Sequence, residues 1–177
     1  MDPKAFKAAL EAIKPNFETL IREGLSRDFA LELISSFEVR DRAHMEQNSL
    51  HDTTLSELFS RYDVLTIEIG MARFYKNPTP VRRGWQIGQV EADDLILDAG
   101  SGEIIVLSID AIDHVMWRCA KDGSAFLAAL ALAAQFYEEC DDDQRGTAVH
   151  MQAFEACTLA AGGAPYSNFY RMLLGVG

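Results

Sequence analysis

The stretch DLILDAGSGEIIVLS, residues 94–108, decides the fold of this 177-residue chain. Two runs rich in aliphatic residues, Asp94–Asp98 and Glu103–Ser108, lie on either side of the short segment Ala99-Gly100-Ser101-Gly102. Because glycine adopts positive φ angles at little cost, this segment predicts a turn between two antiparallel strands. A β-hairpin is therefore the element from which the other assignments start.

Further strands are predicted on both sides of the hairpin. Val64–Ile69 and Trp85–Val90 precede it and Val115–Trp117 follows it, and all three are rich in residues that favour strands. Asn77–Pro80 predicts a loop, since proline cannot donate a hydrogen bond to a central strand ladder. We expect an antiparallel sheet of about four to six strands, the usual size.

Segments with helical periodicity flank this β region. They are Pro3–Phe37, Leu55–Phe59, Ser124–Glu139, Thr147–Ala161 and a last helix that starts near Pro165. The first segment is broken at Pro15 and Gly24, and a helix restarts after an N-cap at Ser26. We expect Thr54 to cap the helix at Leu55–Phe59. Residues 38–54 are polar and predict a loop or a mobile surface segment, and Asp141–Asp143 predicts a solvated break. Helices, then strands, then helices are typical of a single α+β domain, here spanning residues 1–177.

The acidic charge is concentrated in the second half of the chain. The sequence has 16 Lys and Arg against 27 Asp and Glu, a net charge of −11. Residues 1–90 carry 13 acidic and 12 basic side chains, whereas residues 91–177 carry 14 acidic and 4 basic ones. Such a charge repels phosphate, so we expect no charge-driven binding to nucleic acid or to an anionic membrane. It favours a cationic protein partner.

The cysteines and the apolar segments predict a reduced, cytoplasmic protein. Cys119, Cys140 and Cys157 are odd in number and widely spaced, which favours buried thiols over a disulfide framework or a CxxC site. No apolar run typical of a signal peptide follows the first charges. The most apolar stretch, Ala125–Tyr137, is too short to cross a bilayer.

Motifs for catalysis or for cofactors are not found. The glycines at 84–88 and 100–102 complete neither a dinucleotide fingerprint nor a phosphate loop, and Gly100-Ser101-Gly102 is too short for a nucleophile elbow. The histidines form no metal-binding pair, and Arg145 stands at a ligand position of the only segment that resembles a calcium loop. We therefore expect no metal, no cofactor and no enzymatic activity.

Acidic side chains cluster around the predicted hairpin. They are Glu91, Asp93, Asp94, Asp98, Glu103, Asp110 and Asp113. The segment from Glu91 to Asp113 contains no Lys or Arg, which disfavours a nuclease-type metal site. Two interpretations remain, a solvated rim and a protein-binding surface. Trp85 is added to the candidate contact residues, because it follows Arg82-Arg83-Gly84 in a turn-like stretch.

A family resemblance rests on the segment from Gly84 to Leu130. A Gly-Trp turn at Gly84-Trp85 is followed by the hairpin, in which Leu97-Asp98 and Gly102-Glu103-Ile104 resemble a "leucine-x-aspartate … glycine-glutamate-valine" pattern. The later helix opens with Ser124-Ala125-Phe126-Leu127, which is similar to a Ser-x-Phe-Leu start. Together these resemble the SUKH superfamily, which joins fungal regulators of cell-wall synthesis to bacterial immunity proteins. The resemblance implies a non-catalytic α+β domain that binds a protein, in the immunity branch a toxin domain, often a nuclease.

Three functional hypotheses follow. The first is an immunity protein that blocks a cationic toxin domain, with the acidic residues of the hairpin region as the contact surface. The second is a regulatory or housekeeping interaction module without a toxin partner. The third is a small enzyme or ligand-binding domain, which would require a pocket of converging acidic residues with His114 or Cys119.

Overall fold

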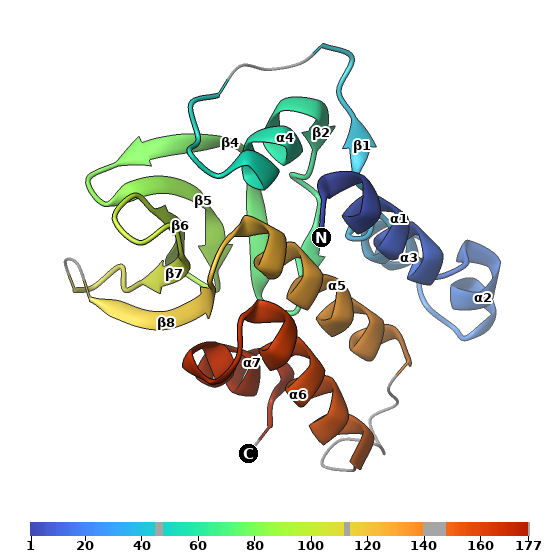
Figure 1. The fold of residues 1–177 in the computed structure, drawn as a ribbon. Helices are drawn as coiled ribbons and strands as arrows, with labels where there is room; N and C mark the ends of the chain where they lie inside the picture. Colours follow the sequence, from blue (N-terminus) through green and yellow to red (C-terminus); the bar gives the residue numbers. More distant parts are fainter. Residues whose placement is uncertain (45–47, 112–113, 140–147, 177) are drawn as a thin grey trace.

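The computed structural model describes residues 1–44, 48–111, 114–139 and 148–176, and places helices around a curled antiparallel sheet (Figure 1). The sheet has six strands in chain order: β3 (Glu68–Ile69), β4 (Ala72–Val81), β5 (Gly84–Val90), β6 (Asp93–Asp98), β7 (Ile104–Leu107) and β8 (Val115–Ala120). Each strand pairs with the next one along the chain, so the sheet is a meander. The predicted α+β class, with an antiparallel sheet of about four to six strands flanked by N-terminal and C-terminal helices, is confirmed.

The β6–β7 hairpin forms as its sequence predicts. Leu97 pairs with Ile104 and Leu95 with Val106 across the two strands. Gly102 has a φ of +77°, and its N–H donates to the Asp98 carbonyl at 2.9 Å. This conformation favours glycine, which explains why the turn is built on the segment 99–102.

Three predictions about the other strands are wrong in detail. Asn77–Pro80, expected to be a loop, lies inside β4, where the pairing with β5 shifts register between Phe74 and Thr79. β3 pairs only with the first two residues of β4, so the prolines lie on an unpaired edge, where strands tolerate them. Of the expected strand Val64–Ile69, only the two residues of β3 form a strand. β1 (Arg40–Asp41), which lies within the segment expected to be a loop, pairs with β2 (Tyr62–Asp63) in a small separate sheet.

The helices lie close to the predicted segments. They are α1 (Pro3–Ile13), α2 (Phe17–Arg22), α3 (Arg27–Ser35), α4 (Thr53–Arg61), α5 (Gly123–Glu139), α6 (Ala148–Ala161), the short 3₁₀ helix η2 (Ala164–Tyr166) and α7 (Ser167–Leu174). The Ser26 cap of α3 is confirmed, whereas α4 is capped by Asp52 and not by Thr54. Asp52 accepts from the N–H groups of Leu55 and Gly123, each at 2.8 Å, and so joins α4 to the start of α5. The break predicted at Asp141–Asp143 lies outside the described residues.

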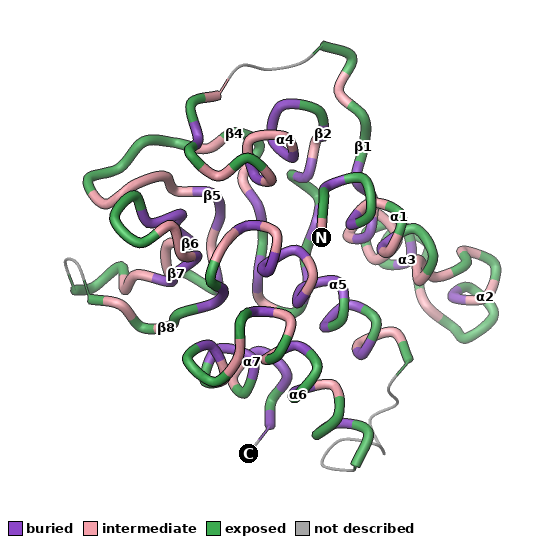
Figure 2. The backbone as a smooth tube through the Cα atoms, in the orientation of Figure 1, coloured by how far each residue is buried: buried purple, intermediate pink, exposed green. Residues whose placement is uncertain are grey.

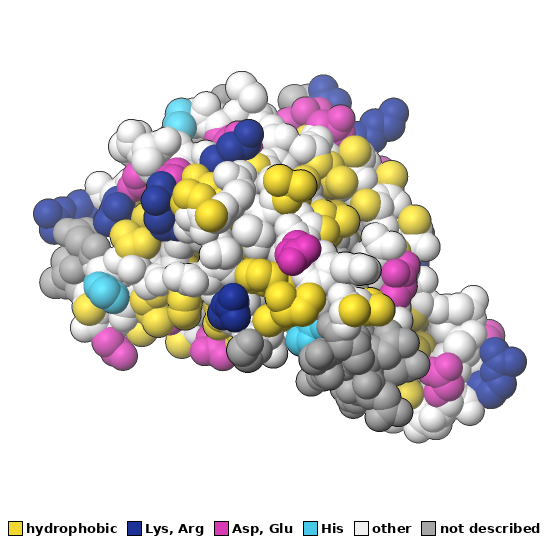
Figure 3. All heavy atoms as spheres, turned by 60° about the horizontal axis from the view of Figure 1, so that its bottom comes forward, with side chains coloured by type: hydrophobic (Ala, Val, Ile, Leu, Met, Phe, Trp, Pro, Cys, Tyr) yellow, Lys and Arg dark blue, Asp and Glu magenta, His cyan; other side chains and the backbone are white. Residues whose placement is uncertain are grey.

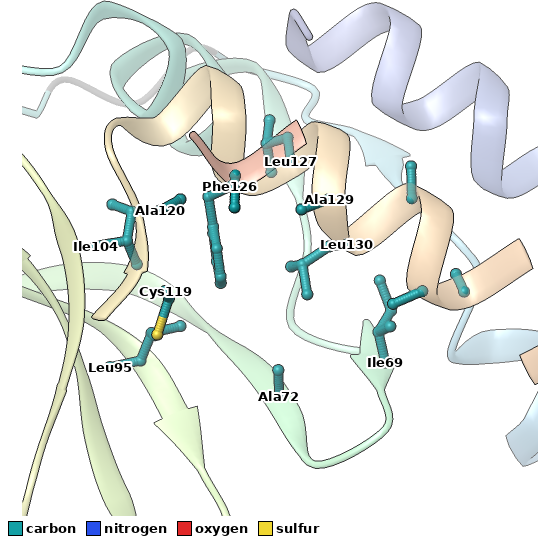
Figure 4. Packing of buried hydrophobic residues seen from close by; sticks show 14 of the residues in the cluster. Ile69, Ala72, Leu95, Ile104, Cys119, Ala120, Phe126, Leu127, Ala129 and Leu130 are labelled. Carbon is teal, nitrogen blue, oxygen red and sulfur yellow. The ribbon is translucent and has the colours of Figure 1, made fainter. Parts of the chain in front are cut away.

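Helix α5 lies at the centre of the core. Ten of its residues are buried, and Figure 2 shows buried backbone along α5 and along the strands beneath it. Figure 4 shows Phe126 and Leu130 pointing from α5 toward Leu95, Cys119 and Ala72 on the sheet. The ring of Phe126 meets that of Phe74 edge to face, with centroids 6.2 Å apart. The apolar α5 sequence is thus explained by contacts with other elements along much of its circumference.

The hairpin strands are covered on both faces. Ile96 and Ile105 pair with each other and are buried, although they alternate with the residues that face α5. This arrangement accounts for the continuous apolar runs of β6 and β7, because a strand with one solvated face would alternate apolar and polar residues.

Two of the cysteines are buried free thiols, as expected. Burial raises the pKa of Cys119 well above its ordinary value and that of Cys157 to about 12, so neither thiol is poised to react. Cys140 lies outside the described residues. Among the helices that the structure describes, none is both long enough and apolar enough to span a bilayer.

Candidate functional site

The predicted acidic residues that the structure describes do not form one surface, because they lie at two opposite ends of the sheet. Asp93 begins β6 and Asp98 ends it, which separates their backbones by about 17 Å at the usual rise of a strand. The Ile109 N–H donates to the Asp93 carboxylate at 2.9 Å and so brings the β7–β8 loop beside the start of β6. The "acidic end" of the sheet is defined here as Glu91, Asp93, Asp94 and Asp110.

No basic side chain among the described residues neutralises the carboxylates of the acidic end. Glu91 and Asp110 are exposed, and Asp93 and Asp94 are half-buried. Asp94 accepts a hydrogen bond from the Gln86 amide at 2.5 Å. In the part of the chain that the structure describes, no Lys or Arg forms an ion pair with these four residues. The side chain of Ile109, 64% exposed, lies in the loop between them. An apolar side chain is thus bordered by free negative charge.

At the opposite end, Asp98 holds the hairpin turn. Its carboxylate accepts from Arg83 Nε at 2.8 Å and from the backbone N–H and hydroxyl of Ser101 at 2.9 and 2.7 Å. Asp98 is only 6% exposed. Burial alone would raise its pKa, but the hydrogen bonds from Ser101 and Arg83 outweigh burial and lower the pKa. Asp98 therefore stabilises the hairpin turn and presents little surface to a partner.

Glu103 belongs to a second internal pair at this end. Both of its carboxylate oxygens accept from the Arg118 guanidinium, and the Tyr166 hydroxyl donates to it at 2.7 Å. Burial would raise the pKa of Glu103, yet these hydrogen bonds lower it. Burial and the bond to Glu103 raise the pKa of Tyr166 to about 12. The carboxylate thus fastens η2 to the hairpin, with Arg118 stacked over the Tyr166 ring at 5.5 Å.

Of the two remaining candidate residues, the structure places only Trp85, and it does not join the acidic end. Trp85 pairs with Leu97 at the end of the sheet that carries Asp98, and its half-buried side chain packs against the core. Asp113 lies outside the described residues. The sequence does not reveal the partners of Asp98 and Glu103, because Arg83, Arg118 and Tyr166 lie 15 to 63 positions away along the chain.

The pKa directions of Asp98 and Glu103 predict a loss of stability in acid. A carboxyl whose pKa is lower in the folded state stabilises the fold above its unfolded value of about 4, and this contribution is lost as pH falls through the lower folded pKa. We expect Asp98→Asn to be less stable than wild type at neutral pH and to lose less stability on acidification. Urea unfolding at a series of pH values measures this, with exposed Asp110→Asn as the control. An equally steep acid loss in Asp98→Asn would contradict the assignment.

A groove of about 560 Å³ lies between α3, the β3–β4 turn and the last turns of α5. Apolar side chains including Phe29, Leu33 and Ile69 line it together with charged ones. His114 and Cys119, the residues that the enzyme hypothesis requires, do not line this groove. Within the described residues, no group of three or more His, Cys, Asp or Glu could hold a metal ion. The sequence misses the groove because its walls come from three separate segments.

Helix α6 presents a second unassigned surface. Val149, Met151 and Leu159 are exposed on it, Leu159 by 78%. Figure 3 shows several groups of hydrophobic side chains, with acidic and basic side chains between them, on the face that is turned forward from the bottom of Figure 1. Nothing among the described residues indicates what covers this exposed face of α6. Compared with protein-family models, curated proteins and solved structures, the chain gives no match.

Proposed function

We propose that this chain is a non-catalytic protein-binding domain that docks a cationic protein at the acidic end of its sheet. The observation that carries the proposal is a set of four carboxylates around the exposed side chain of Ile109. Within the described part of the chain, none of the four has a Lys or Arg partner. Protein interfaces combine a desolvated apolar anchor with a polar rim. Unpaired acidic residues at the rim would attract a basic partner and accelerate its association.

The topology of the sheet supports the choice of this end. In a meander, successive turns alternate between the two ends, so the β3–β4, β5–β6 and β7–β8 connections share one end. The Glu91 N–H donates to the Met71 carbonyl at 3.1 Å, which agrees with this placement. The opposite end carries Asp98 and Glu103, whose charges are already paired with arginines. Of the two ends, the first therefore offers the more negative docking surface.

The resemblance to SUKH immunity proteins extends the proposal to a toxin domain as the partner. A nuclease toxin presents a basic surface to phosphate, and an acidic inhibitor would compete for that surface. In that case the gene for this chain lies beside a toxin gene, and the toxin domain encoded there is the protein to be tested. The proposed partner is thus a basic domain, and its chemistry is that of a nucleic-acid-binding surface.

The proposal predicts a specific loss of association rate. We expect Asp93→Asn, Asp94→Asn and Asp110→Asn combined to slow association with the toxin domain about tenfold and to reduce its salt dependence. Asparagine retains an acceptor for the Ile109 N–H, so the loop is kept. Ile109→Ser is expected mainly to accelerate dissociation, since it removes the apolar anchor. Surface plasmon resonance at several salt concentrations measures both rates.

A charge-matched variant provides the control. Glu11→Gln, Glu23→Gln and Asp28→Asn remove the same number of negative charges from exposed positions on or beside α1, α2 and α3. If this control slowed association as much as the acidic-end variant, net charge and not the acidic end would govern binding. Unchanged rates in the acidic-end variant would contradict the proposed surface.

A further inference from the structure

The groove between α3, the β3–β4 turn and α5 combines apolar walls with an excess of negative charge. Three carboxylates line it, those of Glu32, Glu68 and Glu138, against the single guanidinium of Arg73. Arg73 already pairs with Glu68 at 2.7 Å, and the charge of Glu32 also contributes to raising the pKa of Arg73. The remaining charge of the groove is therefore negative.

Two carboxylates of the groove, those of Glu32 and Glu138, have no ion pair within the described residues, and Glu138 is the one whose charge is affected by burial. Among the described residues, none forms a hydrogen bond or an ion pair with it, whereas its neighbour Glu139 accepts from Gln135 at 2.8 Å. Burial raises the pKa of Glu138, because its charged form has lost water without gaining a counter-ion. An ammonium or guanidinium group that enters the groove would supply the missing counter-ion.

Because the walls of the groove are apolar, its ligand must carry an apolar group as well as a positive charge. Phe29 is 55% exposed at the groove, and Leu33 and Ile69 lie along it. Gly70 also lines the groove and packs closely, since a Cβ added there would lie 2.8 Å from Tyr137 and 2.9 Å from Leu173. A volume of about 560 Å³ is that of a typical ligand site and admits a few side chains.

We propose that this groove binds a basic, amphipathic peptide segment of a protein, which places an apolar side chain against Phe29 and Leu33 and a Lys or Arg beside Glu138. The site is distinct from the acidic end, although the β3–β4 turn that lines it lies at the same end of the sheet. The occupant follows from charge complementarity and from the exposed aromatic wall. A failure here would leave the proposed function of the acidic end unaffected, because different residues carry it.

Fluorescence anisotropy with two labelled peptides tests the proposal. The first is an amphipathic helical peptide of Leu and Lys, and the second has Glu in place of every Lys. We expect wild type to bind only the Lys peptide at about 0.15 M salt. Glu138→Gln and Phe29→Ala are each expected to weaken binding about tenfold, as for a charge-assisted contact and a buried aromatic contact.

Nearby residues provide matched controls on the same two helices. Glu139→Gln removes an identical charge one position away, and Leu31→Ala removes an apolar side chain that is 48% exposed and does not line the groove. Each is expected to change affinity by less than about twofold. Equal losses in the control and groove variants, a loss in Leu159→Ser on α6, or binding of neither peptide would overturn the proposal. Thermal unfolding of each variant verifies that the fold is retained.

Discussion

Replacing Gly88 with alanine is expected to destabilise the domain by about 3 kcal/mol, enough to lower its folded population in cells. Gly88 lies in β5 opposite Phe74 of β4. A Cβ at this position would lie 2.0 Å from the Arg73 carbonyl oxygen and 3.1 Å from the Phe74 Cα. Both atoms belong to the backbone, so no rotamer change relieves the collision. The strands would have to separate and lose ladder hydrogen bonds.

Gly100→Ala is the matched control for this substitution. Its Cβ would meet only the Asp98 carboxylate at 3.5 Å, an ordinary contact, and its φ is not positive. We expect a change in the free energy of unfolding of less than about 0.5 kcal/mol. Urea unfolding monitored by tryptophan fluorescence measures both variants. If the two alanine variants were equally stable, the close approach of β4 and β5 at Gly88 would be wrong.

Gly88 also illustrates how far sequence alone can predict the sheet. Local signals identify the β6–β7 hairpin, since its turn residues and apolar runs are contiguous in the chain. The path of β4 is not predictable in this way, because its prolines are tolerated only on an edge, and the edge arises from the shortness of β3. The cap of α4 is missed for a related reason, because Asp52 and Thr54 both favour N-cap positions and only the structure decides between them.

The sequence predicts which type of residue makes up the candidate site, but it does not predict how these residues are arranged in space. The sequence predicts that carboxylates gather around the hairpin, and the alternation of turns in a meander separates them into two groups. Whether a carboxylate is paired depends on residues that are distant along the chain, as Arg118 and Tyr166 are for Glu103. The groove at Glu138 is lined by three segments that are even farther apart along the chain. Long-range contacts therefore decide which negative charges remain available to a partner.

Phe126→Ala is expected to have the largest effect on stability, a loss of about 3–5 kcal/mol. The ring is fully buried and contacts Phe74, whose own ring meets Phe59 with centroids 6.1 Å apart. Truncation leaves a cavity between α5 and the sheet that the neighbouring rings fill only partly. Leu132→Ala on the same helix, where the side chain is 36% exposed, is expected to cost less than about 1 kcal/mol. Urea unfolding compares the two variants.

The burial of Phe126 affects how the family resemblance is interpreted. The helix start Ser124-Ala125-Phe126-Leu127, on which the resemblance partly rests, buries Ala125, Phe126 and Leu127 in the core. Such residues specify packing, so a similar pattern can indicate a similar fold without a shared partner. Phe126→Leu, which keeps an apolar side chain, is expected to fold with a smaller loss of about 1–2 kcal/mol and to bind the proposed basic partner and the Lys peptide as the proposals predict for wild type. Weakened binding by a folded Phe126→Leu variant would instead indicate that this motif contributes to recognition through the position of α5.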